Sequence, residues 1–319
     1  MNLDLLFSNI TNPAFLFFIL GIVAVKLKSD LEIPPNSSKF ISLYLLFSIG
    51  FKGGQELSHE NFTMEIFWAI LFGIFLSLII PVYAFFILKR KMNVFDSGAI
   101  AAAYGSVSAV TFVTGVSYLE FQKMNFHGHM VAIMALMESP AIIAGLILIS
   151  LFNKEETIKI NKRSVLKHSL TNGSVLLILG SLIIGFLANA KQAEGIKPFT
   201  NDLFKGFLAI FLLDMGINSG RKLNSFFSNG WFPTFFAIII PLFNGCLVAL
   251  ASKVVTVDDS SRFMFSVLAA SASYIAVPAA MKLAVPKANE GLYIPMALAI
   301  TFPLNITLGM PLYLMLIQL

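Results

Sequence analysis

The sequence reads Ile49-Gly50-Phe51-Lys52-Gly53-Gly54-Gln55-Glu56-Leu57 and, later, Met215-Gly216-Ile217-Asn218-Ser219-Gly220-Arg221-Lys222-Leu223. Three further pairs recur in the same order, offset by about 160 to 167 residues: Ile19-Leu20-Gly21 with Ile178-Leu179-Gly180, Ile79–Tyr83 with Ile239–Phe243, and Ala101–Ser108 with Leu268–Ile275. Such a duplication in a very hydrophobic chain is typical of transporters that place a binding site between two repeats.

The composition predicts one polytopic membrane domain. The 319 residues are 57% hydrophobic and 12% charged, with a mean hydropathy of +0.83, whereas about 25% of the residues in a soluble protein are charged. The single cysteine, Cys246, excludes an intramolecular disulfide and a cysteine-based metal cluster. A net charge of +5 does not indicate nucleic acid, because most of the basic residues fall in short loops between apolar stretches.

The apolar stretches predict ten membrane spans, each long enough to cross a bilayer core of about 30 Å. They lie near 12–29, 38–55, 63–89, 96–118, 126–152, 170–190, 201–220, 231–253, 262–283 and 290–317. Most Lys and Arg residues then lie on one side, which should be cytoplasmic, and both termini face outside. Nine or eleven spans, with one terminus moved, is the alternative.

The expected domain organisation follows from five spans in each half. Because five is odd, the second half enters the membrane from the opposite side, and the repeats are inverted. We expect a first repeat at 1–152, a cytoplasmic linker at 153–168 and a second repeat at 169–319. The predicted fold is therefore an all-α polytopic membrane protein with ten transmembrane helices in two inverted five-helix repeats.

Small and hydroxyl residues dominate two corresponding spans, in the stretches 101–111 and 269–278. Glycine and proline weaken a helix, and a broken helix is tolerated in a membrane only where it lines a cavity or is packed by protein. Half-helix N-termini suit an anion, and free carbonyls and hydroxyls suit a hard cation. Tight helix packing is the alternative reading of one such stretch, but two at matching positions favour crossed, broken fourth and ninth helices.

Polar residues within the spans are candidate functional groups. Glu138 precedes Pro140, and its counterpart in the second half is Asn305, which follows Pro303. Each is expected to bind a cation, clamp a broken helix or cap a freed backbone group. Lys52 is expected either to extend its charge to the membrane surface or to attract an anion into an outer vestibule.

Three other groups of polar residues receive lesser roles. Asn244 is expected to form a helix–helix hydrogen bond. Glu120 and Lys123 are expected to be solvated loop charges. His127 and His129 lie two residues apart at a loop edge, which is a poor spacing for a helical metal pair, so we expect sodium as the only metal and no transition-metal site.

The sequence contains no phosphate-binding glycine loop, no His-Glu-x-x-His motif and no Gly-x-Ser-x-Gly motif. We therefore expect that the protein is not an enzyme and needs no cofactor other than a coupling ion.

Several stretches in the same order resemble the sodium-dependent bicarbonate permeases first recognised in cyanobacteria. They are Ile49–Gly54, Gly105–Ser108, Met137–Ala141, Met215-Gly216, Ala269–Ser273 and Pro286–Tyr293. The resemblance implies a fold similar to bile-acid-type sodium symporters, a homotrimer in the bacterial inner membrane, and sodium-coupled bicarbonate uptake. In the cyanobacterial members, a small regulatory protein related to the P-II proteins can bind the cytoplasmic face; the short linker here weakens that expectation.

The chain departs from the family pattern at both expected breaks. Where the first pattern reads Gly-x-Val-Ser-Gly-Ser-Thr, this chain ends in Ala109-Val110-Thr111. Where the second reads Ser-Ser-Ser-Asp-Ile-Ser-Gly-Pro-Pro, it has Ser271-Ala272-Ser273-Tyr274-Ile275-Ala276-Val277-Pro278-Ala279. Each lost hydroxyl or carboxylate removes an oxygen ligand. The resemblance therefore supports the fold of the family more strongly than its substrate. An aspartate of the pattern corresponds to Glu138.

We predict a substrate site at Gly105, Ser106, Val107, Ser108, Ala109, Thr111, Ser271, Ser273, Tyr274 and Ala276. The predicted cation-binding or helix-clamping residues are Glu138, Asn305, Ser108 and Ser273. The first functional hypothesis is sodium-driven uptake of bicarbonate or a closely similar small anion by alternating access. The second is sodium- or proton-coupled transport of another organic anion, and the third is a non-transporting membrane sensor or scaffold.

Overall fold

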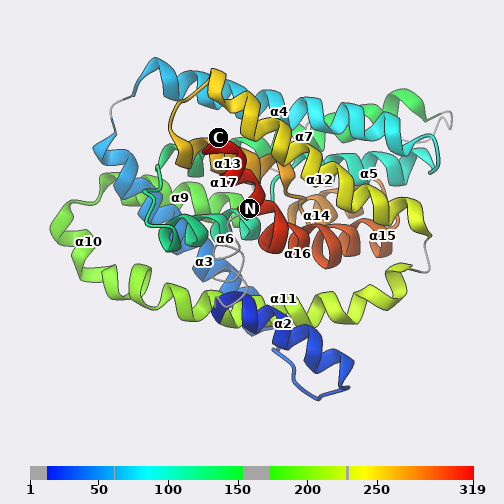
Figure 1. The fold of residues 1–319 in the computed structure, drawn as a ribbon, viewed down its shortest axis with the longest axis horizontal. Coiled ribbons are helices and arrows are strands. Elements are labelled where there is room, and N and C mark those ends of the chain that lie inside the picture. The colour runs from blue at the N-terminus through cyan, green and yellow to red at the C-terminus, as the bar shows by residue number, and fades with distance from the viewer. Residues whose placement is uncertain (1–12, 61, 154–172, 228–229) are drawn as a thin grey trace.

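The computed structural model describes residues 13–60, 62–153, 173–227 and 230–319, and each regular element within them is helical (Figure 1). The helices are α2 (Pro13–Lys26), α3 (Pro35–His59), α4 (Met64–Leu88), α5 (Val94–Gly105), α6 (Ala109–Phe121), α7 (His129–Phe152), α9 (Gly173–Leu187), α10 (Ala190–Lys197), α11 (Phe204–Phe227), α12 (Trp231–Ala251), α13 (Asp259–Ala270), α14 (Ala276–Ala284), α15 (Glu290–Pro295), α16 (Phe302–Leu304) and α17 (Met310–Ile317). Short segments η1 (Pro198–Asp202), η2 (Ser252–Val254), η3 (Met296–Thr301) and η4 (Asn305–Gly309) extend some of them. Most of the expected linker, 154–168, lies outside the described residues.

Among the described residues, six helical segments are long and apolar enough to cross a membrane. They are Met64–Leu88, Val94–Phe121, His129–Phe152, Ala190–Lys222, Trp231–Val254 and Glu290–Ile317. Large apolar side chains on α4 and α12 point outward, among them Phe75 and Phe243, which are more than half exposed. An apolar surface of this kind is unusual in a soluble protein, but it suits lipid, so the chain is an integral membrane protein.

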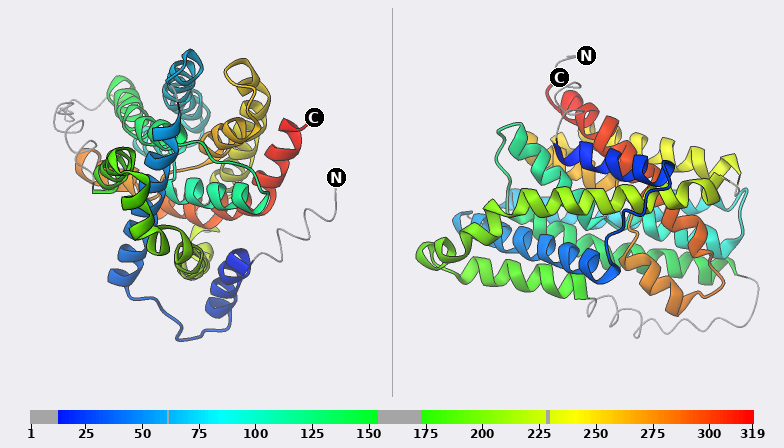
Figure 2. Two further views of the ribbon diagram at one scale, coloured as in Figure 1. Left: turned by 90° about the vertical axis from the view of Figure 1, so that its left-hand side faces the viewer. Right: turned by 90° about the horizontal axis from the view of Figure 1, so that it is seen from below.

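The helices form two groups by their contacts. Helices α2, α3, α9 and α11 form one group, in which α2 packs against α11 and α3 against α9. Helices α4 to α7 and α12 to α17 form the second, larger group, in which α4, α5 and α7 pack together and α12 packs against α13 and α17. In the left view of Figure 2, α2 (dark blue) lies at one edge of the molecule beside α11 (yellow-green). We call these the four-helix group and the core group.

The glycines of the duplicated motif allow the helices of the four-helix group to touch backbone to backbone. A Cβ on Gly54 would lie 2.1 Å from the Leu182 carbonyl oxygen of α9, and one on Gly216 would lie 2.1 Å from the Phe18 carbonyl oxygen of α2. Both distances are far below van der Waals contact, so only glycine fits. Small residues at helix interfaces are a common way to pack helices in membranes.

Two helices of the core group break within the stretches of small residues. Helix α5 ends at Gly105 and α6 begins at Ala109, with Ser106 and Ser108 in extended conformations between them. Helix α13 ends at Ala270, followed by the extended Ser271, and α14 begins at Ala276. The segments 106–108 and 271–275 are thus non-helical backbone inside a helical membrane protein.

One further helix, α10, lies between the spans expected at 170–190 and 201–220. Helix α10 occupies this stretch because Asn189 and Gln192 form a capping box, in which each side chain accepts from the other residue's backbone N–H, both at 3.0 Å.

Candidate functional site

The two helix breaks meet in the core group and satisfy each other's backbone groups. The Ser108 N–H donates to Oγ of Ser271 over 3.0 Å. The Ser273 N–H donates to the carbonyl oxygen of Ala103, at the end of α5, over 2.8 Å. These two hydrogen bonds link segments that are more than 160 residues apart in the chain, and they fix the position where the breaks cross.

A small cavity of about 30 Å³ lies at this crossing. By the 10–15 Å³ needed for one water, it has room for about two waters or one small ion. Its lining residues are Ser42, Leu46, Val107, Ser108, Ala109, Val110, Glu138, Ser174, Ser273, Tyr274, Ile275 and Ala276. Of the residues predicted for the site, Gly105, Ser106, Thr111, Ser271 and Asn305 are not part of this lining.

Glu138 brings a carboxylate from α7 to the cavity. Within the described part of the chain, its side chain makes no hydrogen bond or ion pair. A carboxylate inside a membrane protein normally has a partner, because leaving the charge unpaired is costly. The side chain is half-buried and lines the cavity.

Asn305, the counterpart of Glu138, is instead fully engaged by protein. Its Nδ2 donates to the carbonyl oxygen of Ala270, the last residue of α13, over 2.7 Å. Its Oδ1 accepts from the Tyr313 hydroxyl over 2.9 Å. Asn244 on α12 likewise donates to the Ala269 carbonyl over 3.2 Å. Two asparagines therefore hold the carbonyls that become free where α13 ends.

The hydroxyls at the crossing are used mainly as helix caps. Ser108 Oγ accepts from the Thr111 N–H over 3.2 Å at the start of α6, and Ser273 Oγ accepts from the Val277 N–H over 3.4 Å at the start of α14. Ser106 Oγ is different, because it is buried and finds no partner among the described residues. The first N–H groups of a helix have no acceptor within that helix, and the first two residues of α6, Ala109 and Val110, line the cavity.

A wider cavity of about 460 Å³ adjoins the crossing. It shares Ser42, Ser174, Tyr274 and Ile275 with the smaller cavity, and it also contains Glu32, Lys39, Asp214, Arg221 and Lys222. It therefore lies at the start of α3, on the face to which the sequence assigns most basic loops. Asp214 is buried there and accepts a hydrogen bond from the Ser38 hydroxyl. Tyr274 stands between the two cavities, with its hydroxyl 3.7 Å from Sδ of Met215.

The opposite end of α3 is closed toward the crossing. A separate cavity of about 220 Å³, lined in part by Ser48, Lys52 and Glu120, shares no lining residue with the crossing cavity. Lys52 on α3 forms an ion pair with Glu120 on α6, so Glu120 is not the free loop charge expected from the sequence. This pair joins the four-helix group to the core group at that face.

A comparison with protein families matches residues 13–318 to the model of the Na+-dependent bicarbonate transporter superfamily. The chain belongs to this superfamily. A search of curated proteins finds no match to the chain. Membership in a Na+-dependent transporter family supports sodium as the coupling ion and fits the expectation that the chain is not an enzyme.

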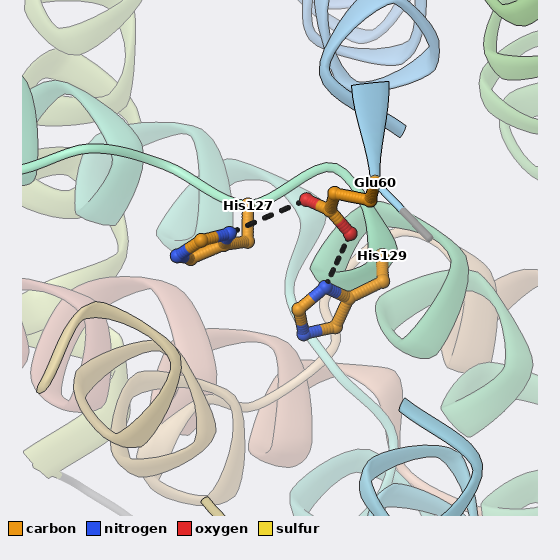
Figure 3. Close-up of side chains that lie close together, drawn as sticks. All are labelled: Glu60, His127 and His129. Atoms are coloured by element: carbon orange, nitrogen blue, oxygen red, sulfur yellow. Dashed lines mark hydrogen bonds and ion pairs between the residues drawn. The ribbon is translucent and has the colours of Figure 1, made fainter. Parts of the chain in front are cut away.

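This bicarbonate-transporter relative also contains a polar cluster that its sequence did not indicate. Glu60, just after α3, lies between His127 and His129 at the start of α7 (Figure 3). Asp258, the N-cap of α13, lies 3.4 Å from Nε2 of His127. Glu60 and Asp258 come from distant parts of the chain, so the spacing of the two histidines alone gave no sign of the cluster.

The cluster shifts the titration of its members. Burial raises the pKa of the Glu60 carboxyl, but hydrogen bonds from His127, His129 and the Gly128 N–H outweigh burial and lower it to about 2. Hydrogen bonds to Asp258 and Glu60 raise the pKa of His127 to about 10 against the effect of burial. His127 thus lies between two carboxylates, which favour a positive charge on its ring or a bound cation beside it.

Proposed function

We propose that this transporter carries bicarbonate, or a closely similar small anion, into the cell together with sodium by alternating access. The observation that carries the proposal is the unpaired Glu138 carboxylate in a small cavity between two broken helices. A cation at this carboxylate would neutralise a charge that is otherwise costly in the membrane. It would also make the cavity a better place for an anion.

The same cavity offers oxygen atoms that could bind a cation and backbone N–H groups that could bind an anion. Oxygen atoms suit sodium, a hard cation, as they do other hard cations; besides Glu138, the buried and unpartnered Ser106 Oγ lies close along the chain to the lining residues Val107 and Ser108. The N–H groups at the start of α6 and the partial positive charge of a helix N-terminus suit the anion. Since the Ser108 and Ser273 N–H groups are already bonded to protein, we place the anion at Ala109 and Val110. Asn305 then acts as a helix clamp.

The arrangement of the cavities supports an alternating-access cycle. The wide cavity reaches the crossing from the basic face, whereas the Lys52–Glu120 pair lies at the other face. If the basic face is cytoplasmic, the structure is the inward-facing state. Movement of the four-helix group against the core group would open the opposite face.

The number of membrane crossings and their orientation are part of this proposal. We propose that the described helices form ten crossings in two inverted five-helix repeats, with broken fourth and ninth crossings at α5–α6 and α13–α14, in the bacterial inner membrane with both termini outside. The homotrimer and the P-II-like regulatory partner concern other chains and stay predictions.

Uptake of radiolabelled bicarbonate into proteoliposomes tests the function. We expect uptake that requires an inward sodium gradient and that falls at least tenfold in Glu138→Ala. Glu194→Gln is the matched control, because Glu194 is an exposed carboxylate on α10 that pairs with the exposed Lys197. Uptake that ignores the sodium gradient, or that is unchanged in Glu138→Ala, would contradict the proposal.

An organic anion is the second candidate substrate, favoured by the size of the wide cavity next to Tyr274. Counterflow with small carboxylates in the same proteoliposomes distinguishes it. Exchange of a carboxylate without exchange of bicarbonate would select the organic anion. The third hypothesis, a non-transporting sensor, requires that neither is exchanged.

A further inference from the structure

The cluster at the end of α3 has the geometry of a metal site. Glu60 Oε1 lies 3.3 Å from Nδ1 of His127, and Glu60 Oε2 lies 2.8 Å from Nδ1 of His129. One ligand atom from each of the three residues can be chosen so that all lie within 4.8 Å of one another. Figure 3 shows both imidazole rings turned toward the carboxylate. None of these three residues takes part in the proposed transport site.

The separations suit a tetrahedral ion. With metal–nitrogen and metal–oxygen bonds of about 2.0–2.1 Å, ligand atoms around zinc are about 3.3 Å apart. The distance from His127 Nδ1 to Glu60 Oε1 has that value already. Since the three ligand atoms lie within 4.8 Å of one another, their widest separation would shrink by at most about 1.5 Å around a bound ion. A set of two imidazoles and one carboxylate favours zinc over calcium or magnesium, which bind mainly to oxygen ligands. The fourth position would be open to water.

Neighbouring groups orient the ligands as they do in known metal sites. A metal-binding histidine usually gives its second ring nitrogen to a carboxylate, and Asp258 Oδ2 lies 3.4 Å from Nε2 of His127. The Gly128 N–H donates to Glu60 Oε1 over 2.9 Å and holds that carboxylate in place. The side chains of Glu60 and His129 are 17% and 12% exposed, so the position is sheltered but can be reached from solution.

We propose that Glu60, His127 and His129 form a binding site for a divalent cation of the zinc class, with Asp258 as a positioning residue. The site joins the four-helix group, through the end of α3, to the core group, through α7 and α13. It lies at the opposite end of α3 from the wide cavity, whose last lining residue on this helix, Leu43, is about 25 Å away along the helix. Zinc bound there would hold that face closed and slow the transport cycle.

The first test measures zinc binding to the purified chain in detergent, after treatment with chelator. We expect one zinc per chain by isothermal titration calorimetry, and weak or no binding of calcium and magnesium. His129→Gln should lower the affinity at least 100-fold, and Asp258→Asn about 10- to 100-fold. His59→Gln is the matched control, because His59 is an exposed neighbour of Glu60 outside the cluster.

The second test needs no variant. Cobalt added to the wild-type chain should give the visible absorption of a tetrahedral site, and zinc should displace it. Absence of that absorption, or equal zinc affinity in wild type and His129→Gln, would overturn the proposal and leave the cluster as a hydrogen-bonded clamp. Because both tests measure binding without transport, their outcome is separate from that of the bicarbonate uptake experiment.

Discussion

The backbone N–H of Ser108 donates a hydrogen bond to Oγ of Ser271 across the crossing of the two breaks. Each break thereby supplies what the other lacks, since free backbone groups in a membrane interior have no water to bind. Ser271 Oγ in turn donates to the Leu268 carbonyl over 2.8 Å. The serine is a bridge from the end of α13 to the other break.

We expect Ser271→Ala to lower the stability of the protein by about 1–3 kcal/mol, because a buried N–H group is left without an acceptor. Thermal unfolding in detergent measures this change. Ser271→Thr should restore most of the stability by returning the hydroxyl. Ser58→Ala is the control, since its exposed hydroxyl bonds only to a carbonyl of its own helix. Equal unfolding temperatures for Ser271→Ala and wild type would contradict the bridging role.

Glu138→Gln should separate stability from function. In sodium-free buffer we expect the variant to be more stable than wild type by up to about 3 kcal/mol, because an unpaired charge has been removed from the membrane interior. Added sodium should stabilise wild type by binding to the folded state and should leave the variant unchanged. Thermal unfolding with and without sodium measures both effects. A variant that sodium stabilises as much as wild type would argue against a cation at Glu138.

Asn305 should be a structural clamp. Asn305→Leu leaves the Ala270 carbonyl and the Tyr313 hydroxyl without this partner, so we expect a loss of about 2–5 kcal/mol. Tyr313→Phe removes only one hydrogen bond and should cost about 1 kcal/mol. A double-mutant cycle from thermal unfolding should show a coupling between the two residues. Additive losses would mean that the Asn305–Tyr313 hydrogen bond does not contribute.

The Lys52–Glu120 pair should keep one face closed. We expect Lys52→Gln to increase the rate at which an impermeant maleimide labels Ser48→Cys, in a Cys246→Ser background that has no other cysteine. Ser48 is buried at present and lines the cavity beside this pair. Lys197→Gln, which removes an exposed pair on α10, is the control. An unchanged labelling rate would show that the pair does not govern access.

Much of the architecture could be predicted because it depends on local sequence. The helices fall on the expected apolar stretches, and both interruptions lie within the predicted stretches of small and hydroxyl residues. Helix α10 could also have been found, since Asn189 followed by Gln192 is a capping signature.

The side-chain partners could not be predicted in the same way. Lys52 with Glu120, and Glu60 with His127, are pairs formed by helices whose relative position is set by packing. The sequence likewise treated Glu138 and Asn305 as equivalent by repeat position. Their environments differ because α7 presents its carboxylate to a cavity, whereas the Asn305 amide meets the end of α13.

The glycine contacts in the four-helix group also join helices from the early and the late parts of the chain. Helix α2 rests on α11, and α3 rests on α9, so each early helix finds its main neighbour in the later part of the chain. Neither part could bury these surfaces alone, and expressed separately each would present a bare helical face to its surroundings. The two parts of the chain are therefore expected to become stable only when both have been inserted into the membrane.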